Sequence, residues 1–392
     1  MTDLPRFSQS PTDPDFVQDP YRFYTRLRAA GPVVWWDDYA MPMASTHDAV
    51  HMALRDNRFG RAPIDAPAIP DHLRDFYAVD ALSMLELEPP MHTRLRALVG
   101  RAFTSRRLRA LQPHVQALCD ELVDGLQDGA DAIADLAAPL AVTVIARLLG
   151  VDGRDAPRLL RWSHDMVGMY QAGRTHADEL AANAAARDFA AYLRAHVDAR
   201  RATPGDDLIS ELIAAEAQGE RLNADELVAT CILLLNAGHE ATVQAMGNAI
   251  RTLVQNAGVA ALLNDPVRAT EETLRYDPPM HLFTRYVYED TVFHGAALQR
   301  GDQIGLLLAS ANRDDDAFGP DADVFDPHRT PRNHATFGAG IHFCVAAPLA
   351  RMELALGLRT LFTAHPNLQI ASLPRFADTY HFHGLTDLRL SL

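Results

Sequence analysis

Apolar residues recur every three or four positions along most of the chain between about residues 90 and 276, as they do on one face of an α-helix. Segments 106–126 and 177–201 are two examples. Strand-like stretches lie near both ends of the chain, at residues 33–38, 41–46, 282–295 and 385–392. This distribution predicts a mainly α fold with a smaller β region built from both ends, an α+β arrangement. No repeat or flexible linker is visible along residues 1–392, and the length is compatible with two average domains or one large fold.

Residues 224–255 read as one long helix with Asn223 as its N-cap. The segment from Leu227 to Leu235 is apolar around most of its circumference, so the helix is expected to run through the interior. Gly238 lies in the middle, where glycine destabilises a helix by about 1 kcal/mol relative to alanine. Its presence indicates close packing against a neighbouring helix, or a bend or close approach of the backbone to a flat group beside Glu240.

The composition excludes several classes of function. The chain has no lysine, so all 36 basic residues are arginine, against 51 acidic residues and a formal net charge of −15. A negative protein repels a polyanion, so nucleic acid is not an expected partner. Schiff-base and lysine-base mechanisms are excluded as well, because both need a lysine amine.

Three widely spaced cysteines, Cys119, Cys231 and Cys344, are too few for a disulfide framework or a cysteine-rich zinc site, which fits a reducing compartment. The N-terminal residues lack the basic start and apolar core of a secretory signal. The longest uncharged, mainly apolar stretch, residues 136–146, is shorter than the roughly 20 residues that span a bilayer. We therefore expect a soluble, cytoplasmic protein with no membrane partner.

Residues 335–362 contain the strongest candidate for chemistry. Gly338 and Gly340 permit a tight turn with positive φ, and Cys344 follows just before a predicted helix with Pro348 in its opening turn. At a helix N-terminus, unpaired N–H groups and the helix dipole favour a thiolate over a thiol. Such a thiolate attacks an electrophile or ligates a soft metal, whereas the alternative is a buried structural cysteine.

Two other charged motifs lie on predicted helices. Glu272 and Arg275 are three residues apart and therefore neighbours on one face, as many solvated surface pairs are. After Pro89-Pro90, His92 and Arg96 are four apart on one face and could bind an anion. An exposed basic face is the alternative.

Taken in order, these segments resemble the cytochrome P450 family, specifically its soluble bacterial members, over nearly the whole length. Phe337, Gly340 and Cys344 are similar to the haem-binding signature of the family. Glu272-x-x-Arg275 resembles its invariant helix pair, and Arg329 corresponds to the arginine that locks this pair. The resemblance implies a triangular helical body with a long central helix, formed here by residues 224–255, and one catalytic domain over residues 1–392 without a fused reductase.

The resemblance also implies a cofactor, haem b, and a role for each matching residue. Cys344 is the expected ligand of the haem iron, on a loop shaped by Phe337, Gly338 and Gly340, with Phe337 shielding the sulfur. The expected partners of the haem propionates, which need cations when buried, are His92, Arg96, Arg285 and His342. Glu272, Arg275 and Arg329 are expected to hold the scaffold of the haem pocket.

The chain departs from the family pattern in two places. Ala346 stands where the family has glycine two residues after the cysteine. In the oxygen-binding stretch 237–242, which includes Gly238, Glu240 is followed by Ala241 instead of the usual threonine. Thr242 is no simple replacement, because one residue turns a side chain about 100° around a helix. In the family, that threonine helps to deliver protons during dioxygen activation.

Three explanations of Ala241 are open: a substrate hydroxyl or an ordered water supplies the relay, the helix shifts so that Thr242 reaches in, or peroxide replaces dioxygen and reductant. We favour the first. The expected reaction is a monooxygenation by hydroxylation or O-dealkylation of a small-molecule substrate. A non-monooxygenase haem-thiolate reaction, a haem-binding sensor or transport protein, and a cysteine hydrolase with Cys344 as nucleophile are the alternatives.

The family layout also suggests substrate contacts and redox partners. The expected pocket residues come from two turns: Met280, His281, Leu282, Phe283, His381 and Phe382. Histidines in these turns favour a substrate with hydroxyl, carbonyl or carboxylate groups, although solvated histidines are equally compatible with the pattern. The 48 residues after Cys344 are too few for a flavin reductase. We therefore expect a monomer that receives electrons from an iron–sulfur ferredoxin and a flavin-dependent ferredoxin reductase, docking at Arg101, Arg106, Arg107 and Arg109.

Overall fold

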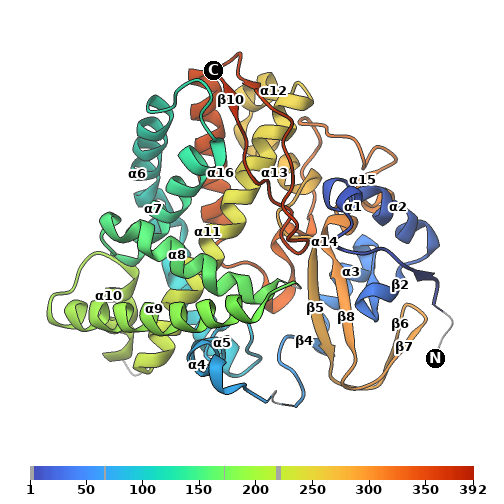
Figure 1. Cartoon of the computed structure of the whole chain (residues 1–392), viewed down its shortest axis with the longest axis horizontal. Coiled ribbons are helices and arrows are strands. Elements are labelled where there is room, and N and C mark those ends of the chain that lie inside the picture. Colours follow the sequence, from blue (N-terminus) through green and yellow to red (C-terminus); the bar gives the residue numbers. More distant parts are fainter. Residues whose placement is uncertain (1–3, 66–67, 172, 218–221) are drawn as a thin grey trace. The chain divides into compact units, whose positions relative to one another are not determined.

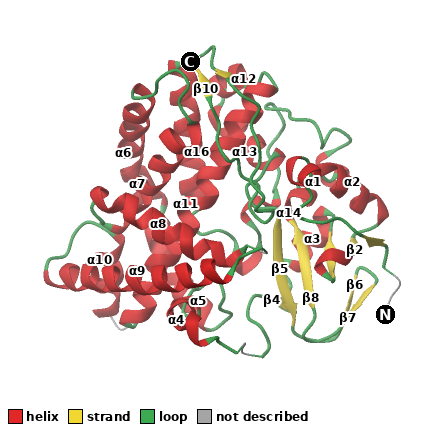
Figure 2. Ribbon diagram, in the orientation of Figure 1, coloured by secondary structure: helices red, strands yellow, loops and turns green. Residues whose placement is uncertain are grey.

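The computed structural model describes residues 4–65, 68–171, 173–217 and 222–392 (Figures 1 and 2). The chain divides into two compact units. Unit 1 consists of Met1–Asp65, Gln116–Ala137 and Ala241–Leu392, and unit 2 of Ala66–Val115 and Ala138–Glu240. All strands among the described residues belong to unit 1. This confirms the predicted mainly α fold, with a β region that both ends of the chain build.

Unit 1 combines its strands with short helices. The helices that lie wholly within it are α1 (Pro14–Gln18), α2 (Tyr21–Ala30), α3 (His47–Ala53), α12 (Val259–Asn264), α13 (Pro266–Tyr276), α14 (Leu308–Ala311), α15 (Asp315–Phe318) and α16 (Ala347–Ala364). The strands are β1 (Arg6–Phe7), β2 (Val33–Trp36), β3 (Met41–Ala44), β4 (Phe59–Gly60), β5 (Leu282–Val287), β6 (Thr291–Phe293), β7 (Ala296–Leu298), β8 (Gln303–Leu307), β9 (Gln369–Ile370) and β10 (Leu390–Ser391). The four strand-like stretches seen in the sequence correspond to β2, β3, β5 with β6, and β10.

Six strands form the main sheet in the order β1-β2-β3-β8-β5-β4, and β6-β7 and β9-β10 form two small antiparallel pairs. Strands β5 and β8, which lie side by side in Figure 1, are antiparallel with Leu282 opposite Leu307. Strand β8 runs parallel to β3. A Cβ on Gly305 of β8 would lie 2.1 Å from the Met43 sulfur, so glycine here makes room for the buried Met43 side chain.

Apolar clusters on the two sides of this sheet anchor β5. One cluster contains the buried aromatic rings of Phe16, Phe23, Tyr24 and Trp36, with Leu282 among them. The other contains Val287 and Ile304, with Phe283 packed against it. Successive side chains of a strand point to opposite faces, so Leu282 and Phe283 enter different clusters.

Among the described residues of unit 2, all regular secondary structure is helical. Its helices are α4 (Arg74–Asp80), α5 (Met91–Gly100), α7 (Ala138–Leu149), α8 (Ala156–Val167), α9 (His176–Ala202) and α10 (Leu208–Ala217). Two helices, α6 (Ser105–Asp124) and α11 (Ala224–Gln255), begin in unit 2 and end in unit 1.

Helix α11 confirms the long helix predicted over residues 224–255. The Asn223 side chain accepts a hydrogen bond from the Glu226 amide at 2.8 Å, and the Glu226 carboxylate accepts one from the Asn223 amide at 2.9 Å. This reciprocal pair is a capping box with asparagine as the N-cap. Within unit 2, a Cβ on Gly238 would lie 3.4 Å from Ile145 of α7, which is an ordinary van der Waals contact, so packing against α7 alone does not require glycine here.

One segment among the described residues, Ala132–Leu149, is long and apolar enough to cross a bilayer by length and composition alone. It consists of a π-helical stretch, Ala132–Ala137, followed directly by α7. It is longer than the apolar stretch 136–146 noted in the sequence. In the structure 61% of it is buried, as in the core helices of globular proteins.

Candidate active site

A buried ion pair on α13 organises the candidate site in unit 1. Arg275 donates from Nε and Nη2 to the two carboxylate oxygens of Glu272, both at 2.7 Å, and each side chain is 3% exposed. Arg275 Nη1 also donates to the carbonyl groups of Asn312 and Ala322, at 2.7 and 2.8 Å. Nη2 reaches the Val324 carbonyl at 3.2 Å, so every N–H of this guanidinium has an acceptor.

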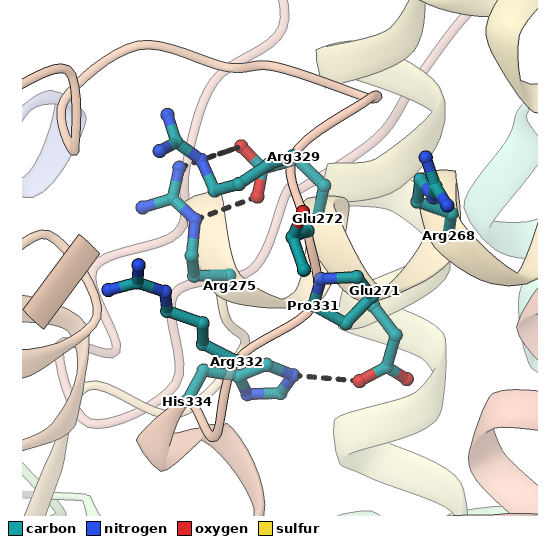
Figure 3. A pocket seen from close by; sticks show the side chains of 9 residues that line it. Arg268, Glu271, Glu272, Arg275, Arg329, Pro331, Arg332 and His334 are labelled. Carbon is teal, nitrogen blue, oxygen red and sulfur yellow. Dashed lines mark hydrogen bonds and ion pairs between the residues drawn. The ribbon is translucent and has the colours of Figure 1, made fainter. Parts of the chain in front are cut away.

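Arg329 joins this pair from the loop that follows α15 (Figure 3). Its Nε lies 3.3 Å from Glu272 Oε1, which also accepts the Asp326 amide at 2.9 Å. Its Nη groups donate to the Phe318 carbonyl and to the Asp321 carboxylate. Burial opposes the charge of Arg329, but the hydrogen bond with Asp321 and the charge of Glu272 outweigh that effect and raise the pKa of Arg329. The predicted association of Arg329 with Glu272 and Arg275 is therefore present in the structure.

Asn312 connects the Arg275 network to the cysteine loop. Its side chain accepts the Ala335 amide at 2.6 Å and donates to Thr336 Oγ1 at 2.8 Å. Thr336 Oγ1 in turn donates to the Leu274 carbonyl of α13 at 2.7 Å. These bonds hold the 3₁₀ turn Ala335–Phe337 against α13, directly before the loop that carries Cys344.

A second acid, the partly buried Glu271, holds the other side of this region. Its carboxylate lies 3.2 Å from His334 Nε2 (Figure 3). It also accepts a hydrogen bond from Arg351 Nη2 at 3.0 Å. The Arg351 guanidinium stacks over the Phe337 ring, 4.4 Å from its centroid. Burial alone would raise the pKa of Glu271, but His334 and Arg351 outweigh burial and lower it to about 2. Glu271 thereby positions Phe337 through Arg351.

The cysteine loop depends on glycine at two positions. Gly338 and Gly340 both have φ near +68°, which confirms the predicted positive φ. A Cβ on Gly340 would also lie 2.2 Å from the Leu54 carbonyl oxygen, so no other residue fits there. Beyond this turn, the Cys344 amide donates to the Phe337 carbonyl at 2.9 Å and closes the loop.

Helix α16 confirms the helix predicted directly after Cys344, with Pro348 in its opening turn. Its N-cap is Ala346 and Pro348 lies in its first turn, so Cys344 is two residues before the N-cap. The Cys344 carbonyl accepts the Ala347 amide at 3.3 Å. Ala346 has φ −90°, which alanine adopts without strain, so this departure from the family glycine is compatible with the backbone.

Burial separates the three cysteines. Cys119 and Cys231 are fully buried, and burial raises the pKa of each thiol to about 12. Cys344 is only partly buried. Because the thiolate is the form that ligates a metal, Cys344 is the one suited to that role.

Unit 1 also places Arg285 and Phe283 on β5 near this loop. A Cβ on Gly338 would lie 3.6 Å from the Phe283 ring, so the two residues are neighbours. Arg285 follows on the same face of the strand and is 2% exposed, with Nη1 donating to the Thr284 carbonyl at 2.8 Å. His342, half-buried, lies in the 3₁₀ turn Gly340–His342 of the cysteine loop. A cation from the sheet and an imidazole from the loop thus belong to the same unit as Cys344.

His92 and Arg96 belong to unit 2. They lie four residues apart on α5, with His92 only 2% exposed and Arg96 half-buried. The neighbouring Arg94 is paired with Glu226 of α11, its Nη1 lying 3.2 Å from Oε2. On α5, the pair predicted to bind an anion is therefore His92 and Arg96, without Arg94.

The stretch 237–242, which the family resemblance predicts to bind oxygen, lies in α11 where unit 2 ends and unit 1 begins. Glu240 ends unit 2, with its Oε2 3.8 Å from His239 Nδ1, and Ala241 and Thr242 begin unit 1. Burial lowers the pKa of His239, an effect that the Glu240 carboxylate partly offsets. Thr242 is 7% exposed whereas Ala241 is half-buried, as expected for side chains about 100° apart on one helix.

The two turns predicted to line the substrate pocket lie side by side in unit 1. Met280 and Phe382 form an antiparallel bridge, and the His281 amide donates to the His381 carbonyl at 3.2 Å. His381 stacks on Tyr39, with Nε2 3.3 Å from the phenol oxygen. Met280, Phe283, His381 and Phe382 are all partly buried.

Two of the predicted pocket residues need correction, because the structure places them in the core. His281 is 0% exposed, with Nδ1 3.0 Å from the Tyr24 hydroxyl and its ring 4.4 Å from that of His383. Leu282 packs among the aromatic side chains of the cluster around Trp36. Neither side chain lines an open cavity. Among the predicted contacts, His381 is therefore the one histidine that still favours a polar substrate.

Comparisons with known proteins agree with this geometry. Residues 267–365, which contain the Glu272 network and the cysteine loop, match the family model described as Cytochrome P450. The chain is 36% identical to cytochrome P450 monooxygenase PikC of Streptomyces venezuelae, over 92% of this chain and 87% of PikC. It is 35% identical to 6-deoxyerythronolide B hydroxylase of Saccharopolyspora erythraea, over 91% of each. The structure of P450BioI in complex with hexadec-9Z-enoic acid ligated acyl carrier protein superposes with a TM-score of 0.91 at 31% identity, covering 96% of this chain and all of that chain.

The chain belongs to the cytochrome P450 family. Members of this family are haem-thiolate monooxygenases that bind haem b. Family membership sets aside the cysteine hydrolase. The donors of this cytochrome P450 fit the cofactor, because its partly buried thiol lies on a fixed glycine loop and a buried arginine lies on the adjacent strand.

Sequence reasoning did not identify Asn312, Glu271 or Arg351 as part of the site. Asn312 lies in a short segment without periodicity, and its role depends on contacts with residues 23 and 24 positions away. Glu271 and Arg351 are 80 residues apart. The adjacency of Glu271 to Glu272 was the available signal, since two consecutive acids on one helix must face different partners.

Replacing Arg275 by glutamine should destabilise the protein by about 3–5 kcal/mol, because Glu272 would remain buried without its partner. The matched control is Arg268→Gln on the same helix. Arg268 pairs with Asp265 at 3.5 Å, but both side chains are more than 40% exposed, so the expected cost is below about 1 kcal/mol. Urea unfolding followed by circular dichroism measures both values. Equal losses in the two variants would contradict the assigned role of Arg275.

The Glu271 carboxylate should make stability depend on pH. Its folded pKa of about 2 lies below the ordinary value of 4.5, so its contribution is complete above pH 4.5 and is lost as the pH falls toward 2. Glu271→Gln should therefore lower the unfolding free energy by roughly 2 kcal/mol at pH 7 and by less at pH 4. Urea unfolding of wild type and variant at both pH values tests this. A difference that stays constant or grows toward pH 4 excludes the carboxylate as the source.

Proposed function

We propose that this cytochrome P450 hydroxylates or O-dealkylates a small organic substrate with dioxygen, using electrons from an iron–sulfur ferredoxin and its flavin-dependent reductase. The observation that carries the proposal is the partly buried Cys344 on a glycine loop that the Glu272 network fixes. We further propose that the two units act together as one catalytic domain. Similarity to named monooxygenases over about nine-tenths of the chain supports both statements.

In this proposal Cys344 supplies the thiolate ligand. When bound, haem activates dioxygen so that one oxygen atom enters the substrate. The chain keeps the sulfur at a defined place, since the Cys344 amide is bonded to the Phe337 carbonyl and Gly340 fits against Leu54. Phe337, which Arg351 and Glu271 hold, covers one side of the loop. The surrounding residues can tune a metal only when its ligands are held in a fixed geometry.

The acidic edge of the cofactor needs cationic partners. We assign this role to Arg285 and His342 of unit 1 and to His92 and Arg96 of unit 2. Arginine suits the task because its planar fork donates two parallel hydrogen bonds to a carboxylate. The burial of Arg285 and His92 strengthens such contacts by excluding water.

Proton supply falls to Glu240 in this scheme, with Gly238 two residues before it on α11. Ala241 offers no hydroxyl, and Thr242 is buried on a different side of the helix. The remaining sources are a hydroxyl of the substrate or an ordered water beside Ala241.

Met280, Phe283, His381 and Phe382 remain the proposed substrate contacts, which gives a largely apolar surface with one imidazole. A substrate that carries its own hydroxyl fits this combination best. Peroxide-driven turnover is the alternative.

The proposed ferredoxin dock must be revised in one residue. Arg107 is paired with Glu211 and its side chain is only 17% exposed, so it is not available as a free cation. Arg106 and Arg109 are exposed and lie three residues apart on α6, hence on one face. This pair forms a local positive surface on an acidic protein, which attracts an acidic partner.

The Cys344→Ser variant tests the cofactor ligand. Reduced wild-type holoprotein under carbon monoxide should show the strongly red-shifted Soret band of thiolate ligation, and the variant should lose it. Cys231→Ser is the control, because that thiol is buried in α11 and stays protonated. A red-shifted band that persists in Cys344→Ser, or a wild-type protein that takes up no haem, is incompatible with the proposal.

The relay proposal predicts the behaviour of Ala241→Thr. If the substrate or a water supplies the hydroxyl, wild type should already couple NADH consumption to product formation, and the added threonine should change the coupled fraction less than about twofold. Substrates lacking a hydroxyl should couple less well in wild type and gain more from the substitution. The ratio of product to NADH measures this. Wild type that is almost wholly uncoupled with every substrate, together with restored coupling in Ala241→Thr, refutes the relay.

Charge reversal should reveal the redox partner surface. The double variant Arg106→Glu/Arg109→Glu should slow reduction by ferredoxin about tenfold or more at low salt, because steering between opposite charges is lost. Reduction by dithionite should be unchanged. The control is Arg154→Glu, an arginine with a 91% exposed side chain outside this surface. Stopped-flow reduction rates distinguish the cases, and equal slowing with both reductants excludes the assignment.

A further inference from the structure

A cluster of nitrogen and oxygen ligands lies in unit 2, apart from every residue assigned above. His72 Nε2 is 2.8 Å from Glu179 Oε2, and His176 Nδ1 is 3.6 Å from the same oxygen. The ligand atoms of all three residues lie within 4.8 Å of one another. In a tetrahedron with zinc bonds of about 2.0–2.2 Å, neighbouring ligand atoms are roughly 3.3–3.5 Å apart. The two distances to Glu179 bracket this value, so small rotations of the side chains would complete a set of three ligands.

Two elements hold these ligands at fixed places. His176 and Glu179 lie in the first turn of α9, which a capping box fixes: Thr175 Oγ1 accepts the Asp178 amide, and Asp178 Oδ2 accepts the Thr175 amide at 2.7 Å. Residues three apart lie on one helix face. The pair is therefore presented together before any ion binds.

Asn183 of α9 brings His72 to this pair. His72 lies in the 3₁₀ turn Asp71–Leu73, directly before α4. The Asn183 side chain accepts the amides of Asp75 and Phe76 at 2.8 and 3.1 Å and donates to the Asp75 carboxylate at 3.2 Å. These bonds join the start of α4 to α9 and keep the preceding turn beside His176.

The exposure of the cluster leaves room for a further ligand. The side chains of His72 and Glu179 are 31% and 21% exposed, and that of His176 is 68% exposed. An ion here can keep a water in its fourth position and needs no buried entry path. The positive end of the α9 dipole opposes a cation, but Asp178 and Glu179 in the same turn offset it. Arg174 contacts Oε1 of Glu179 at 3.1 Å and leaves Oε2 to the two histidines.

The other cluster of this kind, Asp277, His281 and His383, is a poor cation site. All three residues are buried, and Asp277 already accepts a hydrogen bond from Tyr21 at 2.6 Å and from Arg251 at 3.2 Å. Arg313 lies against Tyr21, 3.4 Å from its ring centroid. Two arginines beside a closed cluster repel a divalent ion, whereas the His72 cluster is open to solvent.

We propose that His72, His176 and Glu179 form a zinc site that links the turn before α4 to the N-terminus of α9. Two imidazoles and a carboxylate, with an open fourth position for water, are an established ligand set for zinc. The bound ion would join segments about 100 residues apart in sequence by direct coordination. Local opening of the α4 turn away from α9 would then require loss of a ligand, so the site is a clamp within unit 2.

The test is a titration of the chelator-treated holoprotein with zinc chloride in a buffer that does not bind metals, measured by calorimetry. One zinc ion per chain should bind to wild type, and His176→Ala and Glu179→Gln should each weaken binding at least tenfold. His114→Ala, which removes an exposed histidine of α6, should bind as wild type does. His176 is largely exposed, so its loss should leave the fold intact, and far-ultraviolet circular dichroism and the haem spectrum check this.

Amide hydrogen exchange gives the second readout. Zinc should slow exchange in residues 71–76 and 176–180 of wild type and leave these rates unchanged in His176→Ala. The proposal is overturned if wild type binds no zinc, if the ligand variants bind as tightly as wild type, or if binding occurs without protection of these segments. None of these outcomes depends on turnover or on the haem ligand.

Discussion

The candidate site depends on a buried ionic contact, the bidentate bond between Arg275 and Glu272. Two charges removed from water are costly unless their hydrogen-bonding capacity is filled, and here Arg275 uses all five N–H groups. Three of these bonds go to backbone carbonyls of the segment between Asn312 and Val324. The charge is therefore tolerable only while that segment follows its observed path. Asn312 then passes the constraint to Thr336, and the loop carrying Cys344 begins next to it.

Arginine makes this arrangement possible in a chain without lysine. A guanidinium offers donors in one plane, so Arg275 and Arg329 each bind a carboxylate and several carbonyls together. An ammonium group has three donors on a flexible stem and could not satisfy the same set of acceptors. Arg351 uses the flat face of the group as well, stacking on Phe337 while it bonds to Glu271. The residues that shape the loop are thus tied to two consecutive acids of α13.

The sequence allowed prediction of elements whose signals are local. Helix α11, its Asn223 cap, the positive φ of Gly338 and Gly340 and the pairing of Glu272 with Arg275 all depend on neighbouring residues, and the structure confirms them. Strand β8 was missed, because its short apolar run between β7 and α14 shows no alternation that separates it from a helix. Asn312 and Glu271 were missed for a different reason, since their partners are distant in sequence. His281 and Leu282 were misplaced, because a pattern of residues beside a turn does not tell which side chains enter the core.

The burial of Cys119 and Cys231 has a practical consequence for the chemistry of the intact chain. Their protonated thiols lie inside apolar surroundings, so a maleimide or an aromatic disulfide encounters neither while the fold persists. Cys344 is left as the native nucleophile toward such reagents, and coordination to iron would withdraw it. The number of labels bound per chain would then measure the fraction of molecules in a preparation that lack haem.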